Sequence, residues 1–204
     1  MQRVAYNILE GYLTHLILHY VAPGLWGIFY LFWFLASSRV KATARAEGRL
    51  WTAATRALIV LGYGVIFFGH GLYLGPWNAR FVPLAPAWVV GGCLIQVIGM
   101  GFAIAARHFL GSNWSSRVTI KVDHRLITGG PYALARHPIY TGMLLGLAGT
   151  VIAYGTVVGL VGFLLVAIAY WHKMATEERF LREQFGSDYE DYRRRVKALV
   201  PFVL

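Results

Sequence analysis

Long apolar runs, separated by short segments that hold most of the charge, constrain this chain more than any other feature. The runs cover residues 21–38, 57–74, 87–106 and 139–171. Only 14% of the residues are charged, and the mean hydropathy of the chain is +0.54. Runs of this length are typical of membrane-spanning helices, which satisfy every backbone polar group internally. The sequence therefore predicts an all-α polytopic membrane protein rather than a soluble domain.

The last apolar run is too long for a single span. Its 33 residues, 139–171, would form a helix of about 50 Å, whereas the hydrocarbon core is about 30 Å thick. A break at residues 154–156 divides it into two arms of about 16 residues, each roughly 24 Å long. We therefore expect about five transmembrane helices, the last two forming a short helical hairpin. The spacings Gly142–Gly146 and Gly155–Gly159 would let its arms pack closely.

The distribution of positive charge predicts the orientation. Residues 39–56 and residues 107–137 hold five Lys or Arg each, and the stretch from Lys173 onward holds seven. Because positive loops stay in the cytoplasm, we expect the N-terminus outside and the C-terminus inside, in a bacterial inner membrane or the endoplasmic reticulum. The net charge of +10 would then face anionic lipid, and nucleic acid is not needed to explain it.

A polar stretch, residues 129–142, leads into the last apolar run. Residues 129–131, Gly-Gly-Pro, predict a turn, since glycine permits positive φ and proline fixes its own. Pro138 suits the first position of a helix and disfavours α geometry at the preceding residue, so His137 is expected at the cap. The free N–H groups of that first turn would favour an anionic group, with Arg136 and His137 beside it.

Paired carboxylates, Glu177 and Glu178, follow Lys173 where the last span is expected to end. Such a pair can bind an ammonium or balance a sulfonium. It can also belong to a solvated helix turn that pairs with Arg179 or Arg182.

The tail beyond Gly186 has the pattern of one more helix. Ser187 and Glu190 have the spacing of a capping box. An apolar face would follow at helical spacing, formed by Tyr189, Tyr192, Val196 and Leu199. We expect this helix to fold back as a lid over residues 136–140, the alternative being a helix that lies on the bilayer surface.

The sequence offers no metal-ligand pattern. The histidines of residues 107–137 lack ligand spacing, and Cys93, the single cysteine, cannot form a CxxC pair. No metal is therefore expected, and the oligomeric state is not indicated.

Taken together, these pieces resemble the isoprenylcysteine carboxyl methyltransferase family of membrane methyltransferases and its phospholipid N-methyltransferase relatives. The resemblance covers about residues 107–202, and it lies in the order and spacing of short motifs. These are Ser112-Asn113-Trp114, His124-Arg125-Leu126, Gly130-Pro131-Tyr132, residues 136–142, Glu177-Glu178, Phe185-Gly186 with Tyr189 and Tyr192, and Pro201-Phe202.

The resemblance implies an enzyme that binds S-adenosylmethionine on the cytosolic side and methylates a lipophilic substrate from the bilayer. Residues 1–106 would form three N-terminal helices, with a basic cytosolic loop at 39–56. Residues 107–204 would bind the cofactor through the loop 107–137, the hairpin 138–173 and the tail 174–204. The cofactor-binding residues that it implies are His124, Leu126, Gly130, Pro131, Tyr132, Arg136, His137, Pro138, Tyr140, Gly142, Glu177 and Glu178.

The residues leave two acceptor classes open. A prenyl-type carboxylate, as in isoprenylcysteine O-methylation, is already ionised and needs only alignment and desolvation. Lys173 or Arg107 would hold its head, although the family's carboxyl methyltransferases often have an arginine where Lys173 stands. A phospholipid amine must instead lose a proton, for which Glu177, Glu178 or His137 is the candidate base. We place Lys173, Arg107 and Glu177 in the catalytic set.

Two functions of other classes compete. Sterol reductases, which use NADPH, have a similar C-terminal architecture, and residues 193–195, three arginines, would supply charge for the 2′-phosphate. The double glutamate argues against that reading. A membrane protein that keeps the fold without catalysis is the other alternative.

Overall fold

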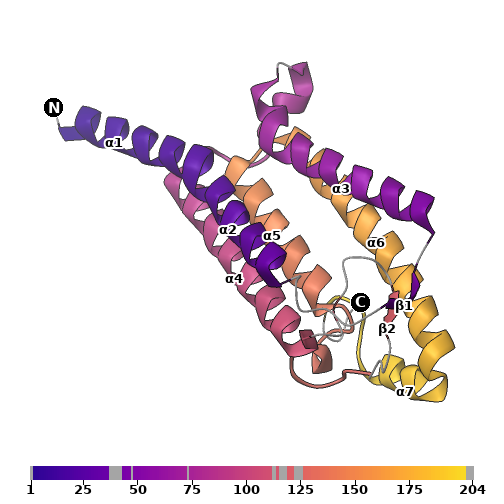
Figure 1. Cartoon of the computed structure of the whole chain (residues 1–204). Coiled ribbons are helices and arrows are strands. Elements are labelled where there is room, and N and C mark those ends of the chain that lie inside the picture. The colour runs from indigo at the N-terminus through magenta and orange to yellow at the C-terminus, as the bar shows by residue number, and fades with distance from the viewer. Residues whose placement is uncertain are drawn as a thin grey trace.

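The computed structural model describes residues 2–36, 43–46, 48–72, 74–111, 114, 119–121 and 126–200. It is a bundle of long helices, with the start of α1 and the last helix, α7, at opposite ends (Figure 1). The helices are α1 (Gln2–Leu16), a π-helical turn η1 (Ile17–Val21), α2 (Ala22–Ala36), α3 (Arg49–Phe68), α4 (Pro86–Leu110), α5 (Pro138–Tyr154), α6 (Val157–Phe185) and α7 (Ser187–Arg195). Short 3₁₀ turns are η2 (Gly69–Gly71), η3 (Gly75–Asn78) and η5 (Gly130–Ala133).

Four helical segments are long and apolar enough to cross a bilayer, and the chain is a multi-pass membrane protein. They are Ile8–Ala36, Leu50–Gly71, Pro86–Leu110 and Val157–Phe185. Helix α5 is apolar but shorter, with 17 residues. It lies alongside α4 within the bundle (Figure 1). The polytopic α-helical architecture is confirmed, whereas a count of five spans stays a prediction.

The predicted break in the last apolar run is confirmed, because α5 ends at Tyr154 and α6 begins at Val157. Gly155 lies between them at φ +66°, in the left-handed region that favours glycine. The second arm is longer than expected: α6 has 29 residues, or about 43 Å. It is therefore longer than an apolar core of about 30 Å, and its charged residues lie in its C-terminal part, from Lys173 to Phe185.

The glycines predicted to pack the two hairpin arms together serve a different contact. A Cβ on Gly142 would lie 2.5 Å from the Gly99 carbonyl oxygen, and one on Gly99 would lie 2.3 Å from the Gly146 nitrogen. These glycines therefore bring α5 against α4, not against α6. Helix α6 packs mainly on α3, where Gly62 and Gly162 approach in the same way. The expectation of closely packed arms was wrong, since a glycine face does not specify its partner helix.

Helix α2 is held to the α4–α5 pair by buried hydrogen bonds. The Gln96 side chain donates to the Ala22 carbonyl at 2.8 Å, and the Trp26 indole donates to the Thr150 hydroxyl at 2.9 Å. Such bonds are favourable inside a bilayer, where water offers no alternative partner.

A small two-stranded sheet adds to the all-α prediction. β1 (Thr43–Ala46) pairs antiparallel with β2 (Thr119–Lys121). One strand belongs to the first basic loop and the other to the long loop before α5, so both loops lie at the same end of the bundle. Helix α7 lies at that end as well (Figure 1).

Candidate functional site

The site is built around the segment that leads into α5. The 3₁₀ turn η5 begins at Gly130, where φ is +57°, and α5 begins at Pro138 with His137 as its N-cap residue. The predicted turn and helix start are confirmed. Proline fits the first helical position because a backbone N–H at that position has no intrahelical acceptor, so the lack of one in proline removes no hydrogen bond.

Backbone N–H groups just before α5 are occupied by the C-terminal tail. The amide of Arg136 donates to the Lys197 carbonyl at 2.8 Å, and that of His137 donates to the Ala198 carbonyl at 3.0 Å. The Thr141 hydroxyl donates to the Leu199 carbonyl at 2.8 Å. Residues 196–199, the strap, thus run along the start of α5. These two amides are satisfied by the chain itself rather than by an anion.

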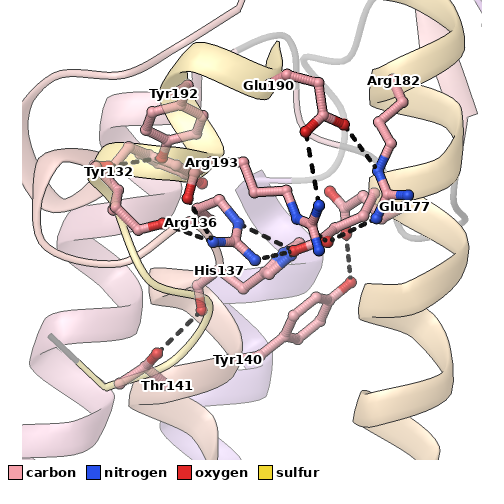
Figure 2. A network of polar contacts seen from close by, with 12 residues as sticks. Tyr132, Arg136, His137, Tyr140, Thr141, Glu177, Arg182, Glu190, Tyr192 and Arg193 are labelled. Carbon is pink, nitrogen blue, oxygen red and sulfur yellow. Dashed lines mark hydrogen bonds and ion pairs between the residues drawn. The ribbon is translucent and has the colours of Figure 1, made fainter. Parts of the chain in front are cut away.

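Glu178 has the most polar partners at this site, and four of those partners, Arg136, His137, Arg182 and Arg193, are labelled in Figure 2. The Arg136 guanidinium donates to its Oε1 from Nε at 3.0 Å and from Nη2 at 2.6 Å, and His137 Nε2 lies 3.3 Å from the same oxygen. Burial alone would raise the Glu178 pKa, but hydrogen bonds from His137 and Arg136 outweigh it and lower the pKa to about 2. Glu178 is therefore an ionised partner of the α5 segment.

Arg136 also reaches the strap. Its Nη1 donates to the Val196 carbonyl at 2.5 Å and to the Arg193 carbonyl at 3.4 Å. All three guanidinium nitrogens are thus bonded within the protein. Arg136 and Glu178 together join α5, α6 and the tail.

Glu177 has a different environment from its neighbour. Its Oε2 accepts a hydrogen bond from the Tyr140 hydroxyl at 3.0 Å and lies 3.9 Å from His137 Nδ1. Its side chain is 36% exposed, against 11% for Glu178. Lys173, one turn earlier on α6, lies 5.6 Å from the centroid of the Tyr140 ring. Glu177, Tyr140, His137 and Lys173 therefore form one cluster between α5 and α6.

An outer layer of ion pairs surrounds Glu178. Arg182 on α6 and Arg193 on α7 lie 3.4 and 3.7 Å from its Oε2. Both arginines also pair with Glu190, at 3.5 and 3.6 Å (Figure 2). The expected capping box between Ser187 and Glu190 was wrong. The N-cap of α7 is Gly186, without a side-chain cap, because Glu190 pairs with arginines instead.

The tail folds back onto the site, although not as one continuous helix. Tyr189 and Tyr192 are buried, and the Tyr192 hydroxyl donates to the Tyr132 carbonyl at 2.6 Å. Burial raises the pKa of both tyrosines, so both remain protonated near neutral pH. Helix α7 ends at Arg195 and Val196 is extended. Val196 and Leu199 were therefore wrongly assigned to the same helix face.

The remaining predicted residues have varied environments. Tyr132 is buried, and burial raises its pKa; the Glu177 carboxylate adds to the rise and Arg107 opposes it. Gly142 packs on α4 rather than on the cluster. Leu126 is half-buried and Pro131 lies in the η5 turn. His124, and the motif residues 112–113 and 201–202, lie outside the described residues.

Arg107 is buried rather than open to an acceptor. Its Nη1 and Nη2 donate to the carbonyls of Gly111 and Ala36 at 2.8 and 2.7 Å. The chain division at 106/107 falls inside α4, which continues to Leu110.

The sequence predicted that the tail would fold back over residues 136–140, but not that carbonyls of residues 197–199 would accept hydrogen bonds from Arg136, His137 and Thr141, because carbonyl acceptors can come from any residue. The sequence showed Arg193 only as part of a basic run, and no pattern of neighbouring residues predicts its ion pair with Glu178.

Comparison with known proteins places this arrangement in a family. A model of the phospholipid methyltransferase family matches residues 87–188. A probable protein-S-isoprenylcysteine O-methyltransferase of Oryza sativa subsp. indica is 34% identical over 172 residues, covering 81% of this chain and 90% of the relative. The cobalt-zinc-cadmium resistance protein CzcN of Cupriavidus metallidurans is 30% identical over 149 residues, covering 72% of this chain and 61% of the relative.

The fold has a solved counterpart. A structure of the eukaryotic intramembrane Ras methyltransferase ICMT matches with a TM-score of 0.53 and 23% identity, over 78% of this chain and 55% of that one. The membrane fold and these relatives together define an integral membrane methyltransferase. The chain belongs to the phospholipid and isoprenylcysteine carboxyl methyltransferase family, as its motifs predicted.

Proposed function

We propose that this enzyme transfers a methyl group from S-adenosylmethionine to the carboxylate of a lipophilic acceptor of the isoprenylcysteine type. The observation that carries the proposal is that two adjacent glutamates have different partners and different exposure to solvent. Glu178 is ionised and held by Arg136 and His137, whereas Glu177 is partly exposed beside Tyr140. One carboxylate thus fixes the architecture, and the other is left to face a ligand.

The cluster suits a cationic methyl donor. S-adenosylmethionine carries a sulfonium and an ammonium and, when bound, supplies an electrophilic methyl group. Glu177, with 36% of its side chain exposed, offers a carboxylate to those cations, and the Tyr140 hydroxyl fixes its orientation. His137 and the η5 turn at Gly130–Ala133 would border the same ligand. Arg136 and Glu178 hold these groups in place.

The acceptor side follows from charge and water exclusion. An ionised carboxylate needs no general base, only alignment and a dry environment. Lys173 on α6 beside Tyr140 is the cation that would orient it. The buried Tyr189 and Tyr192 of the tail exclude water from the other side. A lipophilic acceptor would reach this end of α5 and α6 from the bilayer.

The orientation of the protein is part of the proposal. The basic loops and the tail lie at one end of the bundle, and we place that end in the cytoplasm, where the donor is available. Exposed cations there, such as Arg194 and Arg195, would contact anionic lipid.

Binding and transfer assays test the proposal. Purified protein in detergent should bind S-adenosylhomocysteine but not NADPH by calorimetry, and should methylate a prenylcysteine analogue. Glu177→Gln should weaken nucleoside binding at least about 10-fold, because an interaction with an ionised group is worth about 1.5–3 kcal/mol. Glu183→Gln, an exposed carboxylate on the same helix, is the matched control. Equal affinities of the two variants would count against Glu177, and NADPH binding would favour a reductase.

A phospholipid amine is the second candidate acceptor, favoured by the family model that matches residues 87–188. An amine must be deprotonated before attack, so its methylation should rise with pH, whereas carboxylate methylation should not. Incubation with phosphatidylethanolamine and with the prenylcysteine analogue over the same pH range separates the two.

A further inference from the structure

The last turn of α4 contains a buried cation with an unusual set of partners. Arg107 is 4% exposed, and among the described residues no carboxylate pairs with it. Its Nη2 donates to the carbonyl of Ala36, the last residue of α2, and its Nη1 donates to that of Gly111, which follows α4. One guanidinium therefore joins the ends of two helices at the site end of the bundle.

The same guanidinium supports the start of the long loop. Its central carbon lies 4.4 Å from the centroid of the Trp114 ring. Trp114 is 9% exposed, and its ring meets Trp33 of α2 edge to face, with centroids 5.8 Å apart. A cation–π contact that is shielded from water is stronger than an exposed one. Arg107 thus fixes Trp114 against α2.

The end of that loop is attached to the same turn of α4. A Cβ on Gly130 would lie 2.6 Å from the ring of Phe109, so this ring packs directly against the Gly130 backbone. Gly130 begins the η5 turn, whose Tyr132 carbonyl accepts the hydrogen bond from Tyr192. Residues 107–109 therefore hold both ends of the loop that precedes the Arg136 segment.

The energetics favour a specific geometric role. A buried cation without a carboxylate is costly unless its donors are satisfied. The Nη1 and Nη2 of Arg107 have carbonyl acceptors, whereas its buried Nε has no hydrogen-bond partner among the described residues, so part of that cost remains. The arginine fork reaches the two carbonyls from two separate nitrogens, whereas the three donors of a lysine all lie on one nitrogen. An apolar residue would fill the same volume without this cost, so the residue type has to be explained by what it holds together.

We propose that Arg107 is a positioning residue: it fixes Trp114 and the last turn of α4, and through the Phe109–Gly130 contact of that turn it positions η5 beside the Glu177 cluster. This inference rests on the proposed methyl-donor site. It also replaces the expectation that Arg107 itself holds the acceptor.

The test compares Arg107→Gln with Arg80→Gln. Arg80 also donates to a backbone carbonyl, that of Val82 at 3.1 Å, but beside the α5–α6 turn at the opposite end of the bundle. Hydrogen exchange in the ligand-free protein should become at least about 10-fold faster around Trp114 and Tyr132 in Arg107→Gln only. S-adenosylhomocysteine affinity should fall at least about 10-fold, while the KM for the acceptor stays unchanged.

Two further variants separate the proposed role from a general loss of folding and from the loss of the positive charge. Trp114→Leu removes the ring and leaves both carbonyl bonds, and it should show the same pattern more weakly. Arg107→Lys keeps the charge but not the fork, and it should restore only part of the affinity. Full restoration by lysine, or equal effects of the Arg107 and Arg80 variants, overturns the proposal. If the wild type binds no S-adenosylhomocysteine, the proposed function fails, and the exchange result still decides whether Arg107 orders the loop.

Discussion

Replacing Glu178 by glutamine should release the tail from the start of α5. Glutamine has nearly the same shape but no charge, so Arg136 would be left buried beside a neutral group. The Glu178 pKa is lowered from 4.5 to about 2, and its side chain is 11% exposed. At about 1.4 kcal/mol per pKa unit, the contacts with His137 and Arg136 stabilise the ionised carboxylate by about 3 kcal/mol, or roughly 100-fold. Because Arg136 also bonds the tail, this value is the upper limit of the effect on tail docking.

Hydrogen exchange of the backbone amides before α5 measures that equilibrium. The amides of Arg136 and His137 are bonded to the strap, so their exchange reports release of the tail. We expect exchange to become up to about 100-fold faster in Glu178→Gln. Glu190→Gln is the control: its side chain is 41% exposed and its arginine partners are 44% exposed, so it should change exchange less than about 10-fold. The affinity for S-adenosylhomocysteine should also fall more in Glu178→Gln than in Glu190→Gln.

The pH dependence gives an independent check. Because the folded-state pKa of Glu178 is depressed, its contribution is fully present above pH 4.5 and is lost as the pH falls towards about 2. Tail docking should therefore be constant from pH 8 to 5 and weaken below that range in the wild type. Glu178→Gln should lack this acid-dependent component. Equal protection in the Glu178 and Glu190 variants, or an unchanged acid profile, would refute the reasoning.

Other predictions concern packing, the tail and topology. Gly99→Ala places a methyl group 2.3 Å from a backbone nitrogen of α5 and should destabilise the protein by about 1–3 kcal/mol in a detergent melt; Gly64→Ala, which meets nothing within 4 Å, should be near neutral. Truncation after Gly186 should abolish nucleoside binding while the protein stays monodisperse, and unchanged affinity would make the tail a surface anchor. A cysteine at Asn78 should react with an impermeant thiol reagent in sealed cells and one at Lys197 should not, whereas labelling at Lys197 would contradict the orientation.

Much of the fold was predictable because its signals are local. The length of the apolar runs, the break at residues 154–156 and the helix start at Pro138 depend on neighbouring residues only. The interruption after Phe185 is equally local, since Gly186 has a φ of +51°. The family motifs identified the stretch that contains the site for the same reason.

Which elements meet was decided by the tertiary structure. The glycines of α5 could have faced α6 or α4, and only the packed bundle directs them to α4. Glu190 had the spacing of a cap, yet two arginines from different helices are better partners for its carboxylate.

The roles of the two glutamates show the same division. The sequence alone determined that a carboxylate pair would stand late in α6, at the same end of the hairpin as the start of α5, because the helix limits and the break between the arms are local signals. Only the tertiary structure distinguished Glu178, bonded to Arg136, from Glu177, bonded to Tyr140. These partners lie 42 and 37 residues away in the chain. Adjacent residues on a helix point in directions about 100° apart, so their environments depend on what folds against each direction.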